Sequence, residues 1–208
     1  MTTRKSKKEA QREQMRRNLI ETAESLFAEH GIAAVSLRQI GEYAGSLNTS
    51  VVGYYFGSKE ALIEAIYRFR LPSIEVWRTT YLEELERNGL GMDLGELLKV
   101  IWLPWYNQQD HRGRHSYGGF LRTVNREGLA STRFALDPEY PAGVTAHNRI
   151  KAILAESNVA NVDFRFSMQI NMILETLAYI DARELSPESS NAIFRDALDM
   201  ARVALLTR

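Results

Sequence analysis

The sequence of 208 residues contains no cysteine, which excludes disulfide bonds and any chemistry that requires a thiolate. It has no uninterrupted apolar run close to the roughly 18 residues that a membrane-spanning helix needs. Its first residues are basic and polar, without the apolar segment of a signal peptide. We therefore expect a cytoplasmic protein with no membrane partner.

Recognisable catalytic motifs are also missing, since the chain has neither a phosphate-binding glycine loop nor a serine nucleophile elbow. His111 and His115 lie four residues apart beside Asp110, but Gly113 between them favours a loop over a metal-binding helix face. Glu175 stands in an apolar run, and a lone carboxylate has no catalytic partner there. We expect no enzymatic activity, no cofactor and no bound metal.

The formal net charge is zero, from 26 basic and 26 acidic residues, and this balance argues at first against a nucleic-acid partner. The charges are unevenly distributed. Residues 1–17 hold seven basic side chains against two acidic ones, whereas residues 71–208 hold 15 basic and 18 acidic ones. The sequence therefore has a positive N-terminal end and a C-terminal part that does not favour DNA.

The most informative stretch is Leu37 to Leu62, which predicts two short helices around a glycine turn. Leu37, Ile40 and Ala44 recur at helical spacing, and Gly45 follows where a chain leaving a helix often needs a left-handed residue. A second short helix is expected over residues 48–55. This pattern resembles a helix-turn-helix, although two short helices with such a turn also occur in proteins that never touch nucleic acid.

The second short helix has the chemistry of a helix that enters the major groove of DNA. Small polar residues stand at its beginning, valines behind them point inward, and Gly53 has no side chain. Ser58 is a good N-cap for the next helix, and the neighbouring lysine suits a phosphate. The predicted DNA contacts are Ser36, Arg38, Asn48, Thr49, Ser50, Tyr54, Tyr55 and Lys59.

Together with the helix before it, the stretch from Leu37 to Leu62 resembles the N-terminal signature of the tetracycline-repressor (TetR) family of bacterial transcription regulators. The resemblance covers residues 12–65, with a turn after Gly45 one residue longer than the common pattern and Tyr55 in place of a frequent histidine. It is carried by Ala23, Phe27, Gly31, Ile40, Ala44, Gly45, Tyr54, Phe56, Ser58, Lys59 and Leu62. It implies an all-α fold with an N-terminal three-helix DNA-binding domain and a C-terminal helical domain for ligand binding and dimerisation.

The expected domain organisation has three parts. Residues 1–9 form a flexible basic arm, which is either a solvated tail or an arm that follows the DNA backbone or enters the minor groove. Residues 10–57 form the DNA-binding domain, whose first helix runs from Ala10 to His30 and stops at Gly31. Residues 58–208 form a connecting helix and the ligand-binding and dimerisation domain.

The connecting helix starts at Ser58, and Pro72 is expected to interrupt or kink it because the proline ring removes one amide donor. A second segment then continues to Asn88 and Gly89. This element is either a linker or, as the resemblance favours, a lever whose tilt changes the spacing of two DNA-reading heads.

Aromatic and methionine residues are concentrated in the C-terminal half, where each is either core or part of the small-molecule cavity that the resemblance implies. A wall of this kind suits a mostly apolar effector; an acidic effector would need Arg122, and a neutral one would not. The candidate ligand-binding residues are Trp102, Trp105, Tyr106, Tyr117, Phe120, Arg122, Asn125, Met168, Asn171, Met172 and Glu175.

The last part of the chain predicts a short helix and loop over residues 129–144, which could gate the cavity, and a helix from Thr145 to Ala155. Two long helices follow. Asp163 is expected to cap the first, while Ser186 caps the second with Pro187 at its first position. The apolar stripe of the final helix either closes the monomer's own core or, as the resemblance implies, forms a four-helix homodimer interface.

The resemblance implies a transcriptional repressor that binds a palindromic double-stranded operator as a homodimer and releases it when a small-molecule effector binds. Two alternatives stay open. One is a constitutive DNA-binding regulator without an effector, and the other is a small-molecule-binding protein or enzyme that does not bind DNA.

Overall fold

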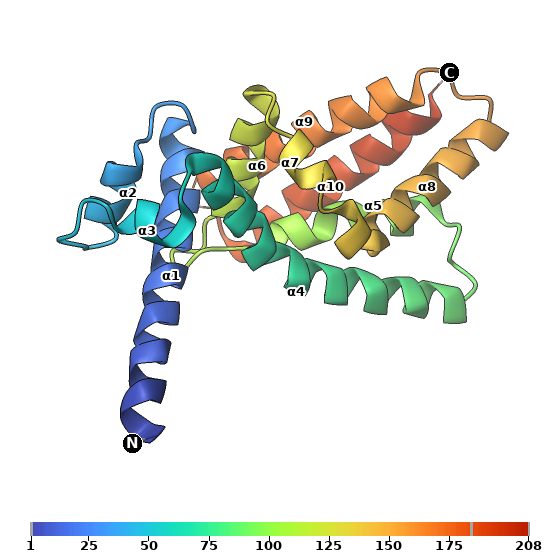
Figure 1. Cartoon of the computed structure of the whole chain (residues 1–208). Helices are drawn as coiled ribbons and strands as arrows, with labels where there is room; N and C mark the ends of the chain where they lie inside the picture. Colours follow the sequence, from blue (N-terminus) through green and yellow to red (C-terminus); the bar gives the residue numbers. More distant parts are fainter. Residues whose placement is uncertain (1, 184, 208) are drawn as a thin grey trace.

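The computed structural model describes residues 2–183 and 185–207, and in this part of the chain all the regular secondary structure is helical (Figure 1). The all-α prediction is therefore confirmed. The helices are α1 (Thr2–His30), α2 (Leu37–Tyr43), α3 (Val51–Phe56), α4 (Lys59–Arg87), α5 (Leu94–Tyr106), α6 (Ser116–Arg126), α7 (Ser131–Phe134), a 3-10 turn (Asp137–Glu139), α8 (Pro141–Glu156), α9 (Val162–Asp181) and α10 (Pro187–Leu206).

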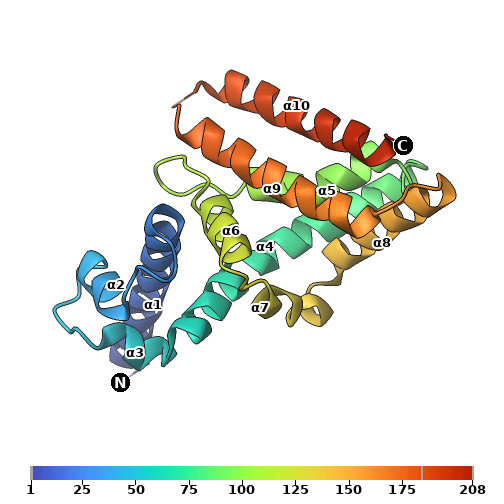
Figure 2. The same cartoon turned by 90° about the horizontal axis from the view of Figure 1, so that it is seen from above.

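The molecule has two ends joined by α4. Helices α1 to α3 lie at one end, and α9 and α10 run side by side at the other (Figure 2). The first turns of α1 stand away from the rest of the chain (Figure 1).

The first helix is longer than predicted, because α1 begins at Thr2 and not at Ala10. Lysine, arginine, glutamate, glutamine and alanine are good helix formers, and no glycine or proline interrupts them before residue 31. The helix ends as predicted at Gly31, which adopts a φ of +88° that disfavours side-chain-bearing residues.

The helix-turn-helix is fixed by local hydrogen bonds. Ser36 caps α2 by accepting a hydrogen bond from the backbone N–H of Gln39, and Gly45 has the predicted left-handed φ of +77°. The second helix is shorter than expected, since α3 begins at Val51 and not at Asn48. The reason lies in the turn before it, where the side chain of Asn48 accepts from the backbone N–H of Ser50 at 3.0 Å.

Helix α4 continues from Lys59 to Arg87 without an interruption at Pro72, so the predicted interruption is wrong, while the alternative of a kink at this proline stays a prediction. Proline cannot bond to the carbonyl of Arg68, four residues earlier. Both Arg68 and Pro72 are exposed, and water can therefore satisfy that carbonyl.

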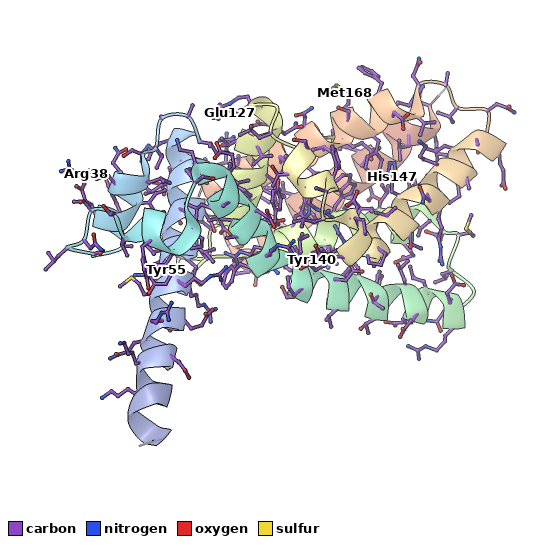
Figure 3. All side chains as sticks on the ribbon, viewed as in Figure 1. Arg38, Tyr55, Glu127, Tyr140, His147 and Met168 are labelled. Carbon is purple, nitrogen blue, oxygen red and sulfur yellow. The ribbon has the colours of Figure 1, made fainter. Side chains whose placement is uncertain are left out.

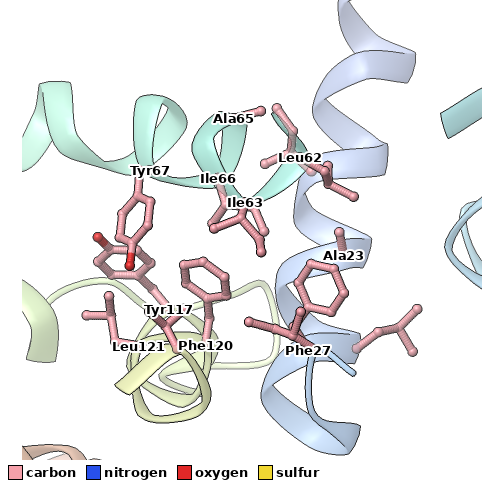
Figure 4. Close-up of a cluster of buried hydrophobic side chains, with 14 of the residues drawn as sticks. Ala23, Phe27, Leu62, Ile63, Ala65, Ile66, Tyr67, Tyr117, Phe120 and Leu121 are labelled. Carbon is pink, nitrogen blue, oxygen red and sulfur yellow. The ribbon is translucent and has the colours of Figure 1, made fainter. Parts of the chain in front are cut away.

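Two hydrophobic clusters form the interior. The first joins α1, α2 and α3 to the first half of α4 and to α6, where Tyr117 and Phe120 pack beside Phe27 and Tyr67 (Figure 4). The second joins the second half of α4 to α5, α8, α9 and α10. Helix α6 thus shares the core of the DNA-binding helices, although the sequence placed it in the C-terminal domain.

The C-terminal helices differ from the prediction at two of their starts. Helix α8 begins at Pro141 and not at Thr145 because proline suits the first position of a helix. Asp163 does not cap α9; Asn161 holds that position with a φ of 57°, and Asp163 pairs with Lys151 at 2.9 Å. Ser186 caps α10 as predicted, through a bond from the backbone N–H of Ser189.

Candidate nucleic-acid interface

The two short helices are anchored by a tightly packed inner face. Ile40 in α2 is fully buried, and Val51 and Val52 in α3 are 7% and 1% exposed. A Cβ added to Gly41 would stand 3.0 Å from Cγ1 of Val51, so the glycine allows α2 and α3 to approach closely. The valines point inward as predicted, and this packing fixes the direction of the opposite face.

The opposite face presents polar and aromatic groups to solvent. Asn48, Thr49 and Ser50 are exposed, and Tyr54 is 71% exposed. Leu47, at the tip of the longer turn, is also fully exposed and was not among the predicted contacts. A protruding turn with small polar groups has the shape required to reach base edges and phosphates in a major groove.

Several predicted contact residues already have partners within the protein. The hydroxyl of Ser36 donates to Gln39 Oε1 at 2.8 Å, so its first role is structural. Arg38 donates to Glu42 at 2.7 Å at the exposed surface (Figure 3), and this hydrogen bond raises the pKa of the arginine. An exposed pair of this kind is worth little and is readily exchanged for a phosphate contact.

Lys59 occupies a structural position that the sequence did not indicate. Its Nζ donates to the backbone carbonyl of Ile32 at 2.8 Å and so ties the start of α4 to the chain that follows α1. The lysine stands in the first turn of α4, where cations are not favoured by the helix dipole. The carbonyl of Ile32 supplies the compensating interaction.

Replacing Lys59 by alanine is expected to lower the free energy of unfolding by about 1 kcal/mol, because the Ile32 carbonyl loses its partner. If Lys59 also contacts a phosphate, the same change weakens binding to all DNA sequences alike and reduces the slope of log affinity against log salt by about one. Urea unfolding and salt-dependent fluorescence anisotropy measure the two effects. Lys151→Ala, which removes an exposed lysine of α8, is the control; equal stability of both variants would contradict the structural role.

A surface hollow separates the first turns of α1 from α3. Its lining residues are Glu9, Arg12, Glu13, Arg16, Tyr54 and Tyr55. Tyr55 is half-buried and meets Tyr54 edge-on at 5.3 Å, while the guanidinium of Arg16 covers the ring of Phe56 at 5.5 Å. The basic part of α1 therefore lies on the same side as the tyrosines of α3, where the DNA backbone would pass.

The predicted ligand-binding residues are not brought together around one space. Trp102 and Tyr106 belong to the second hydrophobic cluster, Tyr117 and Phe120 belong to the first, and Trp105 contacts both. Met168 is 47% exposed on α9, and Met172 is half-buried against the second cluster.

The four polar candidates of that set form two pairs between α6 and α9. Arg122 pairs with Glu175 at 3.2 Å, and Asn125 donates to Asn171 at 2.8 Å. Glu175, Asn125 and Asn171 are exposed, and Arg122 is partly exposed. These residues join two helices at the surface, and Glu175 does not lie among apolar side chains as its sequence neighbours suggested.

The histidine pair is separated by the loop that Gly113 predicted, with a φ of +75° at the glycine. His115 is buried and its Nδ1 lies 2.6 Å from a carboxylate oxygen of Asp181, while His111 is exposed. Within residues 2–183 and 185–207, no three histidine or acidic side chains are grouped to hold a metal ion.

Buried polar contacts connect the DNA-binding helices to α4 and α6, and sequence patterns gave no sign of them. Glu24 of α1 is 1% exposed and accepts two hydrogen bonds of 2.7 Å from Arg70 and one from Ser116. Glu127, just after α6, accepts from the backbone N–H of Ile32 at 3.0 Å. The orientation of α1 is therefore coupled to the position of α6.

The fold and the exposed turn define a helix-turn-helix protein of the bacterial regulator class. Residues 19–66 match the family model described as bacterial regulatory proteins, tetR family. The chain is 34% identical over 178 residues to the HTH-type transcriptional repressor KstR2 of Rhodococcus jostii strain RHA1, covering 84% of this chain and 81% of KstR2. The chain therefore belongs to the TetR family and is a DNA-binding regulator.

A solved structure agrees at the level of the fold. A mutant of HlyIIR with an alanine-substituted segment covers 95% of this chain and 98% of its own, with 20% identity and a TM-score of 0.52. No helix in the described part of the chain is long and apolar enough to cross a membrane.

Proposed function

We propose that the protein is a transcriptional repressor that binds a palindromic operator as a homodimer and releases it when a small, mostly apolar effector binds the C-terminal half. The observation that carries the DNA-binding part is the anchored helix-turn-helix, whose exposed face carries Asn48, Thr49 and Tyr54. The repressor assignment is supported by the 34% identity to a protein named as a repressor. A constitutive regulator without an effector is the alternative.

The dimer is supported by exposed apolar side chains on the last two helices. Phe164, Met168 and Tyr179 recur along one side of α9, and Figure 3 places Met168 at the outer edge of the molecule. Met200 and Val203 of α10 are 61% and 57% exposed. Apolar groups concentrated on two adjacent helices are typical of an oligomer interface, and a two-fold protein matches a palindromic site.

The base-reading role of the turn is tested by Asn48→Ala. Its side-chain N–H groups have no partner among the described residues, whereas its oxygen is used by the turn, so only the amide nitrogen is free to meet a base. We expect the variant to lose about 1 kcal/mol or more of discrimination at one base pair of each half-site. Selection from a randomised duplex pool measures this preference for wild type and variant.

Ser46→Ala is the matched control, because Ser46 belongs to the same turn but its hydroxyl is engaged with Asn48. A sequence preference that is unchanged in Asn48→Ala would move the base contacts elsewhere on the helix-turn-helix. An equal change in both variants would mean that the shape of the turn, and not the amide, determines the preference.

A further inference from the structure

A buried guanidinium lies in the middle of the protein, in the second half of α4. Arg78 is 4% exposed, and it donates from Nε to the carbonyl of Val100 at 3.0 Å and from Nη2 to that of Ile101 at 2.8 Å. The Val100 carbonyl has no hydrogen-bond donor within the helix, because Pro104, four residues later in α5, has no N–H. Two carbonyls orient the guanidinium but do not neutralise its charge.

Among the described residues, no carboxylate forms an ion pair of 4.0 Å or less with this guanidinium. Of the nearby acids, Asp137 pairs with Arg133, and Glu75 accepts from the backbone N–H of Ala142 at 2.8 Å through Oε1, while its Oε2 is buried without a hydrogen-bond partner among the described residues. Burial is the largest influence on the pKa of Arg78 and lowers it to about 10; the positive charge of Arg133 acts in the same direction, whereas Tyr117, Glu75 and Asp137 act to raise it. A buried cation without a close counterion is unfavourable, and an anion bound beside it would compensate for that.

Gly143 and Tyr117 lie near the guanidinium, and the charges of Tyr117 and Arg78 act on each other's pKa. A Cβ added to Gly143, in the first turn of α8, would stand 2.7 Å from Nη1 of Arg78, so the glycine makes room for the guanidinium. Tyr67 and Tyr117 are each 1% exposed and lie together (Figure 4). Burial raises the pKa of both hydroxyls, which therefore keep their protons and can donate hydrogen bonds.

These groups lie where the two hydrophobic clusters meet. Tyr67 and Tyr117 belong to the first cluster, Arg78 bonds to α5 of the second, and Trp105 packs against both. A ligand bound between the two clusters would change the distance between the DNA-binding helices and the C-terminal helices. A ligand with a negatively charged group would pair with Arg78, and an apolar body on the same ligand would contact the two adjoining hydrophobic clusters.

We propose that the region around Arg78, where the two hydrophobic clusters meet, binds a monocarboxylic acid with an apolar body, and that Arg78 anchors its carboxylate. The inference rests on the proposed function, because the acid would be the effector that releases DNA. It differs from the sequence-based expectation, in which Arg122 receives an acidic ligand, since Arg122 is at the surface and already paired with Glu175.

The test is isothermal titration calorimetry on the full-length protein in phosphate-free buffer. The probes are octanoate, 4-phenylbutyrate and cyclohexylacetate, each compared with its primary amide, together with inorganic phosphate. We expect at least one acid to bind once per chain and at least about tenfold more tightly than its amide, as a charge-assisted hydrogen bond requires. Arg78→Gln removes this preference, and the matched control Arg122→Gln keeps it.

Tyr117→Phe provides a second variant if Arg78→Gln does not fold, since it removes only a hydroxyl. We expect it to lower the affinity for the acid severalfold and to leave the affinity for the amide unchanged. The proposal would be overturned if no acid binds, if acids and amides bind equally, or if phosphate binds as tightly as the best acid. A preference for acids that is lost only in Arg122→Gln would also overturn it. Binding to operator DNA is measured separately by anisotropy. Arg78-dependent acid binding without release of DNA would support the site and contradict the effector part of the proposed function.

Discussion

Replacing Glu24 by alanine lowers the free energy of unfolding by about 3 kcal/mol or more, which is the largest effect on stability that we expect from a single polar residue. Glu24 is 1% exposed and is the salt-bridge partner of Arg70, whose side chain is only 13% exposed. Without the carboxylate, the guanidinium of Arg70 and the hydroxyl of Ser116 both lose a partner in a site that water barely reaches. Urea unfolding followed by circular dichroism measures the change.

Glu21→Ala is the matched control, because Glu21 lies in the same helix and pairs with Arg17 in an exposed position. We expect that variant to change stability by less than about 0.5 kcal/mol. A similar small effect for Glu24→Ala would mean that the buried pair does not hold α1 against α4 and α6.

The double variant Met168→Glu/Val203→Glu is expected to convert a dimer into a folded monomer and to weaken operator binding at least about a hundredfold. The charges would stand on the exposed apolar side of α9 and α10, where two chains of a dimer would bring like charges together in a dry interface. A monomer contacts one half-site, whereas the dimer binds two at once. Analytical ultracentrifugation gives the mass, and fluorescence anisotropy gives the affinity.

Val76→Glu is the control for this experiment, since Val76 is 68% exposed on α4, away from the last two helices. It should leave both the mass and the DNA affinity unchanged. A double variant that remains a dimer would place the interface on another surface of the chain.

Features determined by neighbouring residues were predictable from the sequence. Ser58 and Ser186 cap helices, Gly31 and Gly45 adopt positive φ, and Val51 and Val52 point inward, as expected. Each depends on a few consecutive residues whose chemistry has one favourable arrangement.

Features that depend on distant partners were not predictable. The predicted phosphate contact of Lys59 stays a prediction, but the bond from Lys59 to the carbonyl of Ile32, 27 residues away in the chain, had no sign in the sequence. Arg78 shows no distinguishing pattern in the sequence, because its burial depends on a carbonyl that Pro104 opens in another helix. Aromatic residues such as Trp102 and Tyr117 were grouped by composition, whereas the fold divides them between two clusters.

The predicted starts of two helices were also wrong, each for a physical reason. The start of α1 at Thr2 follows from the intrinsic helix propensity of the first residues, which outweighs the high charge of that segment. The late start of α3 follows from the side chain of Asn48, which bonds within the turn and delays the helix until Val51.

The central claim is that the helix-turn-helix reads a specific DNA sequence. The most direct measurement is fluorescence anisotropy of the purified protein with labelled DNA from upstream of its own gene, with a scrambled duplex as control, over a range of salt concentrations. We predict tight binding to the upstream DNA, at least about a thousandfold tighter than to the scrambled duplex at physiological salt. Equal, weak and strongly salt-dependent binding to both duplexes would contradict sequence-specific recognition at this site.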